Sequence, residues 1–269
     1  MAEPPILYTR VGHAEWGDNR AFGYSVASDL AGRESFVGLL LLSIAGRRPT
    51  EPERGLLDDI AIGMTVAEPR VWPLKLVRVV SSYANDLTAF AAGQLCQSAA
   101  PIGLHSIGRA AEFLESVLSE LGEAADDSTL LAEHLRARLA EGRRLPGLGI
   151  PFRPVDERVT LLCASARARG RAELPYFRLI LRLQSVLESL DAPLPNGSLA
   201  TAALLLDLAL TPRQCGMLAA MLCSADFVGN AVEGAEQAAP ALRELPAGFV
   251  VYNGREPRAT PRALAKNSR

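Results

Sequence analysis

The 269-residue chain is long enough to bury a substantial core, and with 49% hydrophobic and 22% charged residues it has the composition of an ordinary globular protein. A formal net charge of −2, with arginines spread along the chain, argues against a protein that binds nucleic acid through a basic face. Few aromatic residues and many alanines and leucines favour packed helices over a β-sandwich.

The four cysteines are Cys96, Cys163, Cys215 and Cys223, and they show neither a CxxC pair nor the spacing of a zinc site. We therefore expect buried thiols in a reducing compartment and no bound metal. The N-terminus lacks the apolar stretch of a signal peptide, and the apolar runs at 37–44 and 199–210 are shorter than a membrane span. These features predict a cytoplasmic protein that does not enter a membrane.

The periodicity of apolar residues predicts an all-α protein of about ten helices. The first thirty residues read as an irregular arm with at most a short extended piece, and the one strand-like pattern is at 249–252, within an extended C-terminal stretch at 248–269. The expected helices cover residues 35–45, 50–64, 74–82, 86–96, 106–121, 128–140, 157–169, 175–190, 199–209 and 212–237.

Helix starts are indicated by local capping residues. Ser35 is placed to cap the first helix, which Gly46 then ends, and Thr50 with Glu53 three residues later forms a capping-box pattern. Asp86 is expected to cap the helix that follows it.

A segment rich in glycine and proline, residues 145–158, interrupts the helical pattern. Its prolines and glycines exclude a continuous helix, and Gly147 and Gly149 permit backbone angles and close approaches that a Cβ would block. Because helices flank it, we expect this loop to carry functional side chains held by a rigid frame.

The order of several short motifs resembles that of the citrate synthase family. Ser35-Phe36 with Gly46-Arg47-Arg48-Pro49-Thr50 resembles the "SFEE…LLxGxLPT" opening, and the segments at 78–82 and 86–93 resemble "RVxAST" and "DxYAAxAAG". The segment at 103–108 occupies the place of "GPLHGGA", and the 145–158 loop occupies the place of "PGFGHPxYxxxDPR". Further along, the segment at 195–199 resembles "PNVDFY" and the segment at 251–254 resembles "YxG".

The resemblance covers about residues 24–258, and the compact length is similar to the small citryl-CoA-lyase-like branch. It implies an all-α fold in which a large and a smaller helical domain form a cleft. The expected division is 1–105 for the first part of the large domain, 106–210 for the small domain and 211–269 for the rest of the large domain. The family also implies a homodimer, and coenzyme A as part of an acyl-CoA substrate with no other cofactor.

Two positions that resemble the family's ligand-contacting residues are retained. His105 stands where relatives have a histidine that stabilises the enolate oxygen, although Ser106 and Ile107 replace two glycines. The alternative is a hydrogen-bonded histidine at a helix start. Arg158 matches the arginine that grips a substrate carboxylate in relatives, and the alternative is a structural ion pair with Asp156.

Other positions have lost the family's chemistry. Ile150, next to Gly149 in the loop, replaces a histidine that polarises a ketone, and an alkyl group donates no proton. Ser198 replaces the aspartate base and is either an activated nucleophile or a helix cap. Glu68 stands near the place of a third histidine and offers a carboxylate, or is simply solvated.

A second substrate arginine of relatives would fall near Cys223 or Ser224, which carry no charge. Three functional hypotheses follow. The first is an enzyme that makes or breaks a C–C bond in a CoA thioester, other than in ordinary citrate synthesis. The second is a catalytically inactive binding or partner subunit, and the third is thioester hydrolysis through Ser198.

Overall fold

The computed structural model describes most of the chain. The described residues are 7–65, 71–83, 85–99, 105–142, 145–150, 153–236, 248, 251 and 253–255. Several predictions lie outside them, namely those for Glu68, for the strand at 249–252 and for most of the C-terminal stretch; the side chains of Cys96 and His105 are also outside the described set.

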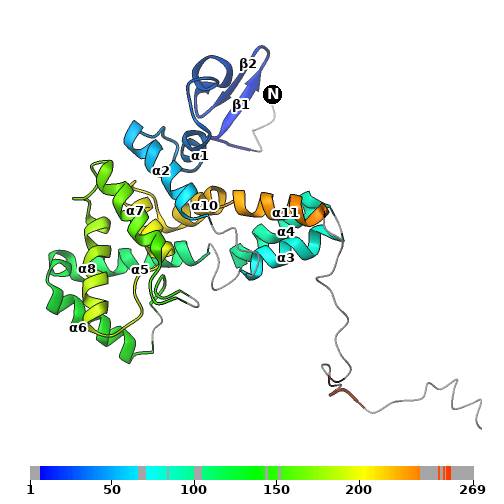
Figure 1. The fold of residues 1–269 in the computed structure, drawn as a ribbon. Helices are drawn as coiled ribbons and strands as arrows, with labels where there is room; N and C mark the ends of the chain where they lie inside the picture. Colours follow the sequence, from blue (N-terminus) through cyan, green and yellow to red (C-terminus); the bar gives the residue numbers. More distant parts are fainter. Residues whose placement is uncertain are drawn as a thin grey trace, which may run out of the picture.

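Within these residues the chain forms a small β-sheet followed by eleven α-helices, so the predicted all-α class is confirmed (Figure 1). The helices are α1 (Phe36–Ala45), α2 (Glu51–Gly63), α3 (Trp72–Ser81), α4 (Asp86–Ala99), α5 (His105–Leu121), α6 (Ser128–Ala140), α7 (Glu157–Ala168), α8 (Pro175–Ser189), α9 (Gly197–Leu206), α10 (Pro212–Leu222) and α11 (Ala225–Glu236). A π-helix, η1 (Val26–Leu30), and a 3₁₀-helix, η2 (Gly122–Asp126), complete the set.

The N-terminal arm is more regular than expected. It forms a three-stranded antiparallel sheet in the order β1 (Gly12–Glu15), β2 (Asp18–Ala21) and β3 (Tyr24–Ser25). Phe22 and Gly23 both have positive φ, as a tight turn between antiparallel strands requires. The prediction of an irregular arm was therefore wrong, because turn geometry rather than apolar alternation defines these mostly exposed strands.

The predicted caps of the first two helices are confirmed. The Ser35 hydroxyl accepts a hydrogen bond from the Gly38 amide, and Gly46 ends α1 in the left-handed region. Thr50 and Glu53 form the reciprocal capping box at α2. The predicted cap of α4 was off by one residue, because Asn85, not Asp86, accepts from the Thr88 amide 2.7 Å away.

The expected helix at 212–237 is two helices, α10 and α11, separated at Cys223 and Ser224. By length and composition the span Pro212–Glu236 would be long enough to cross a membrane. In the structure its two halves pack against other helices, α10 against α5 and α11 against α3 and α4.

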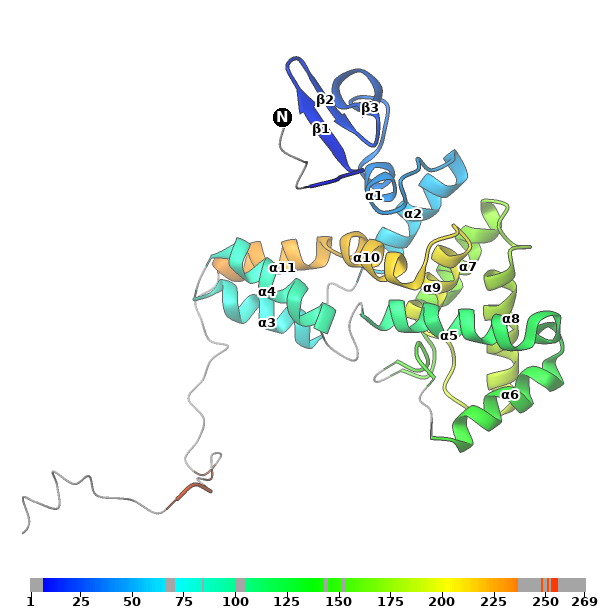
Figure 2. The same ribbon diagram turned by 180° about the vertical axis from the view of Figure 1, so that it is seen from behind.

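Two apolar clusters form the interior. The larger one gathers side chains of α1, α2 and α5 to α10, while the smaller one joins α3, α4 and α11. Figures 1 and 2 show the α3, α4 and α11 group on one side of the molecule, α5 to α8 on the other, and the sheet projecting from the end near α1. The proposed division into large and small domains stays a prediction.

Helix α9 occupies the centre of the larger cluster. It packs against α5, α7, α8 and α10, and nearly all of its residues are buried. Both of its ends are therefore fixed by neighbouring segments, and its first turn is where the candidate site is built.

Candidate functional site

Asn196 organises the start of α9. Its Oδ1 accepts hydrogen bonds from the amides of Ser198 at 2.9 Å and Leu199 at 3.3 Å, so it is the cap of this helix. Its Nδ2 donates to the Gly149 carbonyl 2.8 Å away. One side chain therefore both caps the helix and holds the glycine- and proline-rich loop against it.

Two more backbone contacts bind that loop to the segment before α9. The Gly149 amide donates to the Leu194 carbonyl, and the Asn196 amide donates to the Gly147 carbonyl. Gly147 and Gly149 both have positive φ, and a Cβ at Gly147 would lie 2.7 Å from the Cβ of Leu199. The backbone angles expected of these glycines are thus confirmed at both positions and the close approach at Gly147, where the loop packs on the first turn of α9.

A buried ion pair joins α7 to the same turn. The Asp156 carboxylate accepts from Nε and Nη2 of Arg158, at 2.8 and 2.7 Å, and from the Gly197 amide at 2.8 Å. Burial alone would raise the pKa of Asp156, but the hydrogen bonds from Arg158 and Gly197 hold it below its ordinary value. The structural pairing considered for Arg158 is therefore present, and it uses two of the three guanidinium nitrogens.

Helix α5 contributes its first turn. The hydroxyls of Ser106 and Ser198 lie 3.1 Å apart, which places the residue after His105 directly against α9. His105 is the first residue of α5. Among the described residues, the Ser106 hydroxyl is the one side-chain partner of the Ser198 hydroxyl, so no base is seen to activate it. The interpretation of Ser198 as the helix cap was wrong, because Asn196 has that role.

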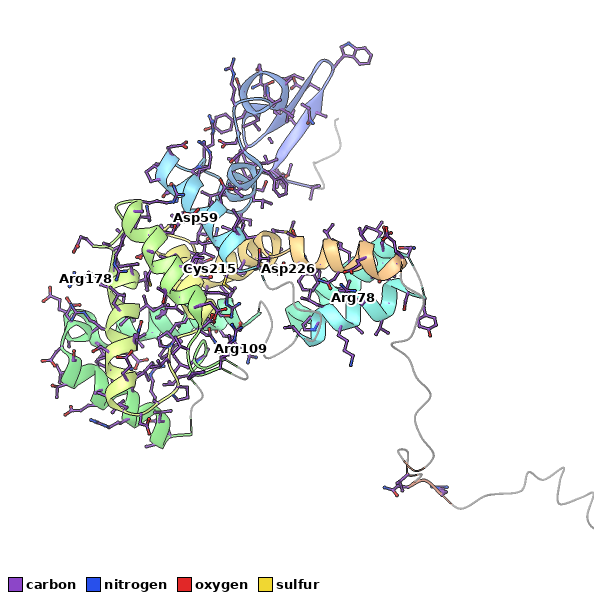
Figure 3. The ribbon with its side chains drawn as sticks, in the orientation of Figure 1. Asp59, Arg78, Arg109, Arg178, Cys215 and Asp226 are labelled. Carbon is purple, nitrogen blue, oxygen red and sulfur yellow. The ribbon has the colours of Figure 1, made fainter. Side chains whose placement is uncertain are left out.

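The remaining lining is uncharged. Ile150 is half-buried and forms an isolated β-bridge with Arg153. Burial raises the pKa of the Cys223 thiol to about 12, with the Asp226 carboxylate adding to the effect, so Cys223 is neutral at physiological pH. Figure 3 shows Asp226 at the start of α11. Position 223, where relatives have a second arginine, is therefore neutral, although Arg158 of α7 lies close enough to lower the pKa of this thiol slightly.

The structure thus brings together four of the predicted segments around the first turn of α9. They contain His105, Gly149 with Ile150, Arg158 and Ser198. Asn196 and Ser106 were missed as organising residues. An asparagine directly before a helical pattern is a known cap signal that would have identified Asn196, whereas the Ser106–Ser198 contact has no local sequence signal.

The predicted buried thiols can be located in part. Cys163, Cys215 and Cys223 are buried thiols, as predicted. In the part of the chain that the structure describes, no group of three or more His, Cys, Asp or Glu side chains is arranged to hold a metal ion.

The sequence matches no family model and no curated protein. The structure is similar to that of citryl-CoA lyase from Hydrogenobacter thermophilus, with a TM-score of 0.79, 19% identity and coverage of 97% of this chain and 100% of that chain. It is also similar to Methanosaeta concilii ATP citrate lyase solved with (3S)-citryl-CoA, with a TM-score of 0.76 and 18% identity, covering 95% of this chain and 43% of that one.

Citrate synthase from Thermoplasma acidophilum, solved with carboxymethyl coenzyme A and oxaloacetate, has a TM-score of 0.65 and 16% identity and covers 84% of this chain and 58% of that chain. These likenesses agree with the resemblance of the motifs along the sequence. The chain has the citrate synthase fold, in a compact form that extends over the full length of a citryl-CoA lyase.

Proposed function

We propose that this protein binds a CoA thioester at the first turn of α9 and makes or breaks a C–C bond next to the thioester carbonyl. The observation that carries the proposal is the convergence of the loop 145–150 and the starts of α5, α7 and α9 on one turn. The sequence motifs that resemble the citrate synthase family lie on these same segments, and two proteins with this fold were solved with CoA-containing ligands.

Each predicted residue has a role in this chemistry. In the bond-forming direction, a base removes a proton from the carbon next to the thioester, and the resulting enolate attacks a carbonyl carbon whose oxygen then takes up a proton. His105 would hold the enolate oxygen, and the remaining N–H groups of Arg158 would orient a carboxylate. Gly149, Ile150 and Ser198 would shape the site, and Glu68 is a candidate for the base.

The substituted positions make ordinary citrate chemistry an unsuitable assignment. Ile150 and Cys223 present an alkyl group and a neutral thiol. Losing one oxyanion donor reduces rates by about 100- to 1,000-fold, so a substrate that needs polarisation at position 150 would react slowly. The site suits an acyl-CoA whose reaction partner lacks several carboxylates.

A catalytically inactive binding subunit is the second candidate. It is favoured by one observation, that the hydroxyl of Ser198 meets another hydroxyl rather than a basic group among the described residues. The same observation disfavours thioester hydrolysis through Ser198, since an unactivated hydroxyl is a weak nucleophile.

Thermal unfolding in the presence of CoA, acetyl-CoA and citryl-CoA tests the binding proposal, because a ligand of the folded state raises the apparent stability. The ester that gives a shift is then assayed for turnover with wild type, His105→Ala and the control His134→Ala, which lies on α6 beside Arg138. The enzyme proposal requires turnover that falls at least 100-fold in His105→Ala alone. Binding without turnover would favour the inactive subunit, and no binding would refute both.

A homodimer is proposed on the exposed side of the α10–α11 pair. Met217 and Met221 on α10 and Val228 and Val232 on α11 are all exposed, and the spacing of four within each pair puts its two residues on one face of their helix. Sedimentation equilibrium should give a dimer for wild type and a monomer for Met217→Glu with Met221→Glu; a wild-type monomer would contradict the proposal. A cytoplasmic location is proposed from the buried, unpaired thiols.

A further inference from the structure

Arg158 adds little net positive charge to the proposed site. Its guanidinium is paired with the buried carboxylate of Asp156 at 2.7 Å, so the two side chains together are close to neutral. Ile150, Ser106, Ser198 and Cys223 add no charge. A second anionic group, beyond the carboxylate that the remaining N–H groups of Arg158 would orient, would therefore need another cation.

Arg109 is such a cation. It lies on the first turns of α5, three residues after Ser106, and residues at this spacing are neighbours on one helix face with Cβ atoms about 5–6 Å apart. Ser106 is the residue whose hydroxyl reaches Ser198. Figure 3 places Arg109 at the end of α5 that meets the loop 145–150.

The Arg109 side chain is exposed and makes no hydrogen bond or ion pair with a described residue. Arg138 and Arg178 show the usual alternative, since each is held by a carboxylate, that of Glu120 and that of Asp126. The acidic residue one turn further along α5, Glu112, does not pair with Arg109 either. A planar fork of five N–H donors is thus available beside the Ser106–Ser198 contact.

We propose that Arg109 binds the terminal carboxylate of a dicarboxylic acyl-CoA, such as a succinyl thioester. This inference rests on the proposed function, which puts the acyl group at the first turn of α9. A guanidinium also matches phosphate, but the proposed function puts the acyl group rather than the phosphates at the turn shared by Ser106 and Ser198, so a carboxylate on that group is what Arg109 would meet.

Succinyl-CoA and butyryl-CoA form a matched pair of probes, since both have four-carbon acyl chains and only the first has a carboxylate. Their dissociation constants are measured by calorimetry with wild type, Arg109→Gln, Arg109→Lys and the control Arg136→Gln, which removes an exposed arginine from α6. In Arg109→Gln the dissociation constant for succinyl-CoA should rise about 10- to 100-fold, and that for butyryl-CoA less than about threefold. Arg109→Lys, which keeps the charge without the fork, should lie between.

Equal losses for both esters in Arg109→Gln would mean that Arg109 contacts the CoA moiety, and would overturn the inference while the proposed function stands. No loss for either ester, or an equal loss in Arg136→Gln, would overturn it as well. Wild type that binds another CoA ester but not succinyl-CoA would overturn the inference alone. If wild type binds neither ester and none of CoA, acetyl-CoA and citryl-CoA, the proposed function fails; the carboxylate site is then tested with succinate alone. A stability shift with succinate that Arg109→Gln abolishes supports the carboxylate site, and its absence overturns both.

Discussion

The Asp156 carboxylate accepts a hydrogen bond from the Gly197 amide 2.8 Å away, and this contact ties the start of α7 to the start of α9. Arg158 completes the arrangement, because its guanidinium packs where a side chain on Gly197 would have to be. The carboxylate, the guanidinium and the first turn of α9 therefore depend on one another.

Asp156→Asn should lower the free energy of unfolding by about 3 kcal/mol, because it leaves the largely buried Arg158 cation without its partner. Urea unfolding followed by circular dichroism measures the change. Glu157→Gln, at the exposed next position, is the control and should leave the midpoint unchanged. A small effect of Asp156→Asn would show that solvent or another group takes over the pairing.

Acid should remove the stabilisation that the ionised Asp156 carboxylate provides through Arg158 and Gly197. The pKa of Asp156 is lowered in the folded state, because its bonds from Arg158 and Gly197 outweigh the cost of burial. A lowered pKa gives stability that is present above the ordinary aspartate value near 4 and is lost as the pH falls through the folded value. The wild-type unfolding free energy should therefore fall more steeply below pH 4 than that of Asp156→Asn; parallel pH profiles would contradict this.

Asp207 should give the opposite dependence on pH. Burial raises its pKa to about 6, although its carboxylate accepts from the amides of Tyr176 and Phe177 at the start of α8. A raised pKa gives stability that is fully present below about pH 4 and is lost as the pH rises through 6. Between pH 5 and pH 7.5, wild type should lose about 1 kcal/mol relative to Asp207→Asn in urea unfolding. A constant difference between the two proteins would refute the assignment.

The two functions of Asn196 can be separated by substitution. Asn196→Asp keeps an acceptor for the amides of Ser198 and Leu199 but loses the donor to Gly149, whereas Asn196→Ala loses both. The alanine variant should be about 1–2 kcal/mol less stable than wild type, as for other lost caps. Hydrogen exchange at the amides of 147–149 should quicken in both variants. Unchanged exchange in Asn196→Asp would show that the Nδ2 contact does not hold the loop.

The two loop glycines should differ in their tolerance of alanine. Both have positive φ, which costs about 1–2 kcal/mol for an alanine. At Gly147 the new Cβ would also lie 2.7 Å from Leu199, whereas at Gly149 it would be 3.5 Å from Pro193, an ordinary contact. Gly147→Ala should therefore lower the free energy of unfolding by about 2–4 kcal/mol, and Gly149→Ala should lower it by about 1–2 kcal/mol. Equal effects of the two substitutions would contradict the close packing of the loop on α9.

Features that depend on neighbouring residues were predictable from the sequence. The Ser35 cap and the Thr50–Glu53 capping box are local arrangements, so helices α1 and α2 were placed nearly to the residue. The break between α10 and α11 could not be predicted from the sequence, because it falls at Cys223 and Ser224, which are neither glycine nor proline. Tertiary packing decides where this break lies. The N-terminal sheet was missed for a related reason, since its strands lack a buried apolar face.

The candidate site was predictable as a set of segments but not as a geometry. The loop 145–158 and the residues around Ser198 were identified along the chain, yet nothing local indicates that the hydroxyls of Ser106 and Ser198 meet. The same holds for the hydrogen bond that the Gly197 amide donates to the Asp156 carboxylate, because these residues are far apart in sequence. Such contacts arise because α5 and α7, which carry Ser106 and Arg158, pack against α9 in the folded protein.

The projecting N-terminal sheet has a practical consequence. Trp16 stands fully exposed at the turn between β1 and β2, and Gly17 beside it has a positive φ with open space around it. A peptide tag or a fluorophore inserted at this turn would extend into solvent, far from the helical interior. The tip is thus a suitable attachment point for immobilising the protein on a surface, because the projecting sheet is separate from the helices around α9 that carry the proposed site.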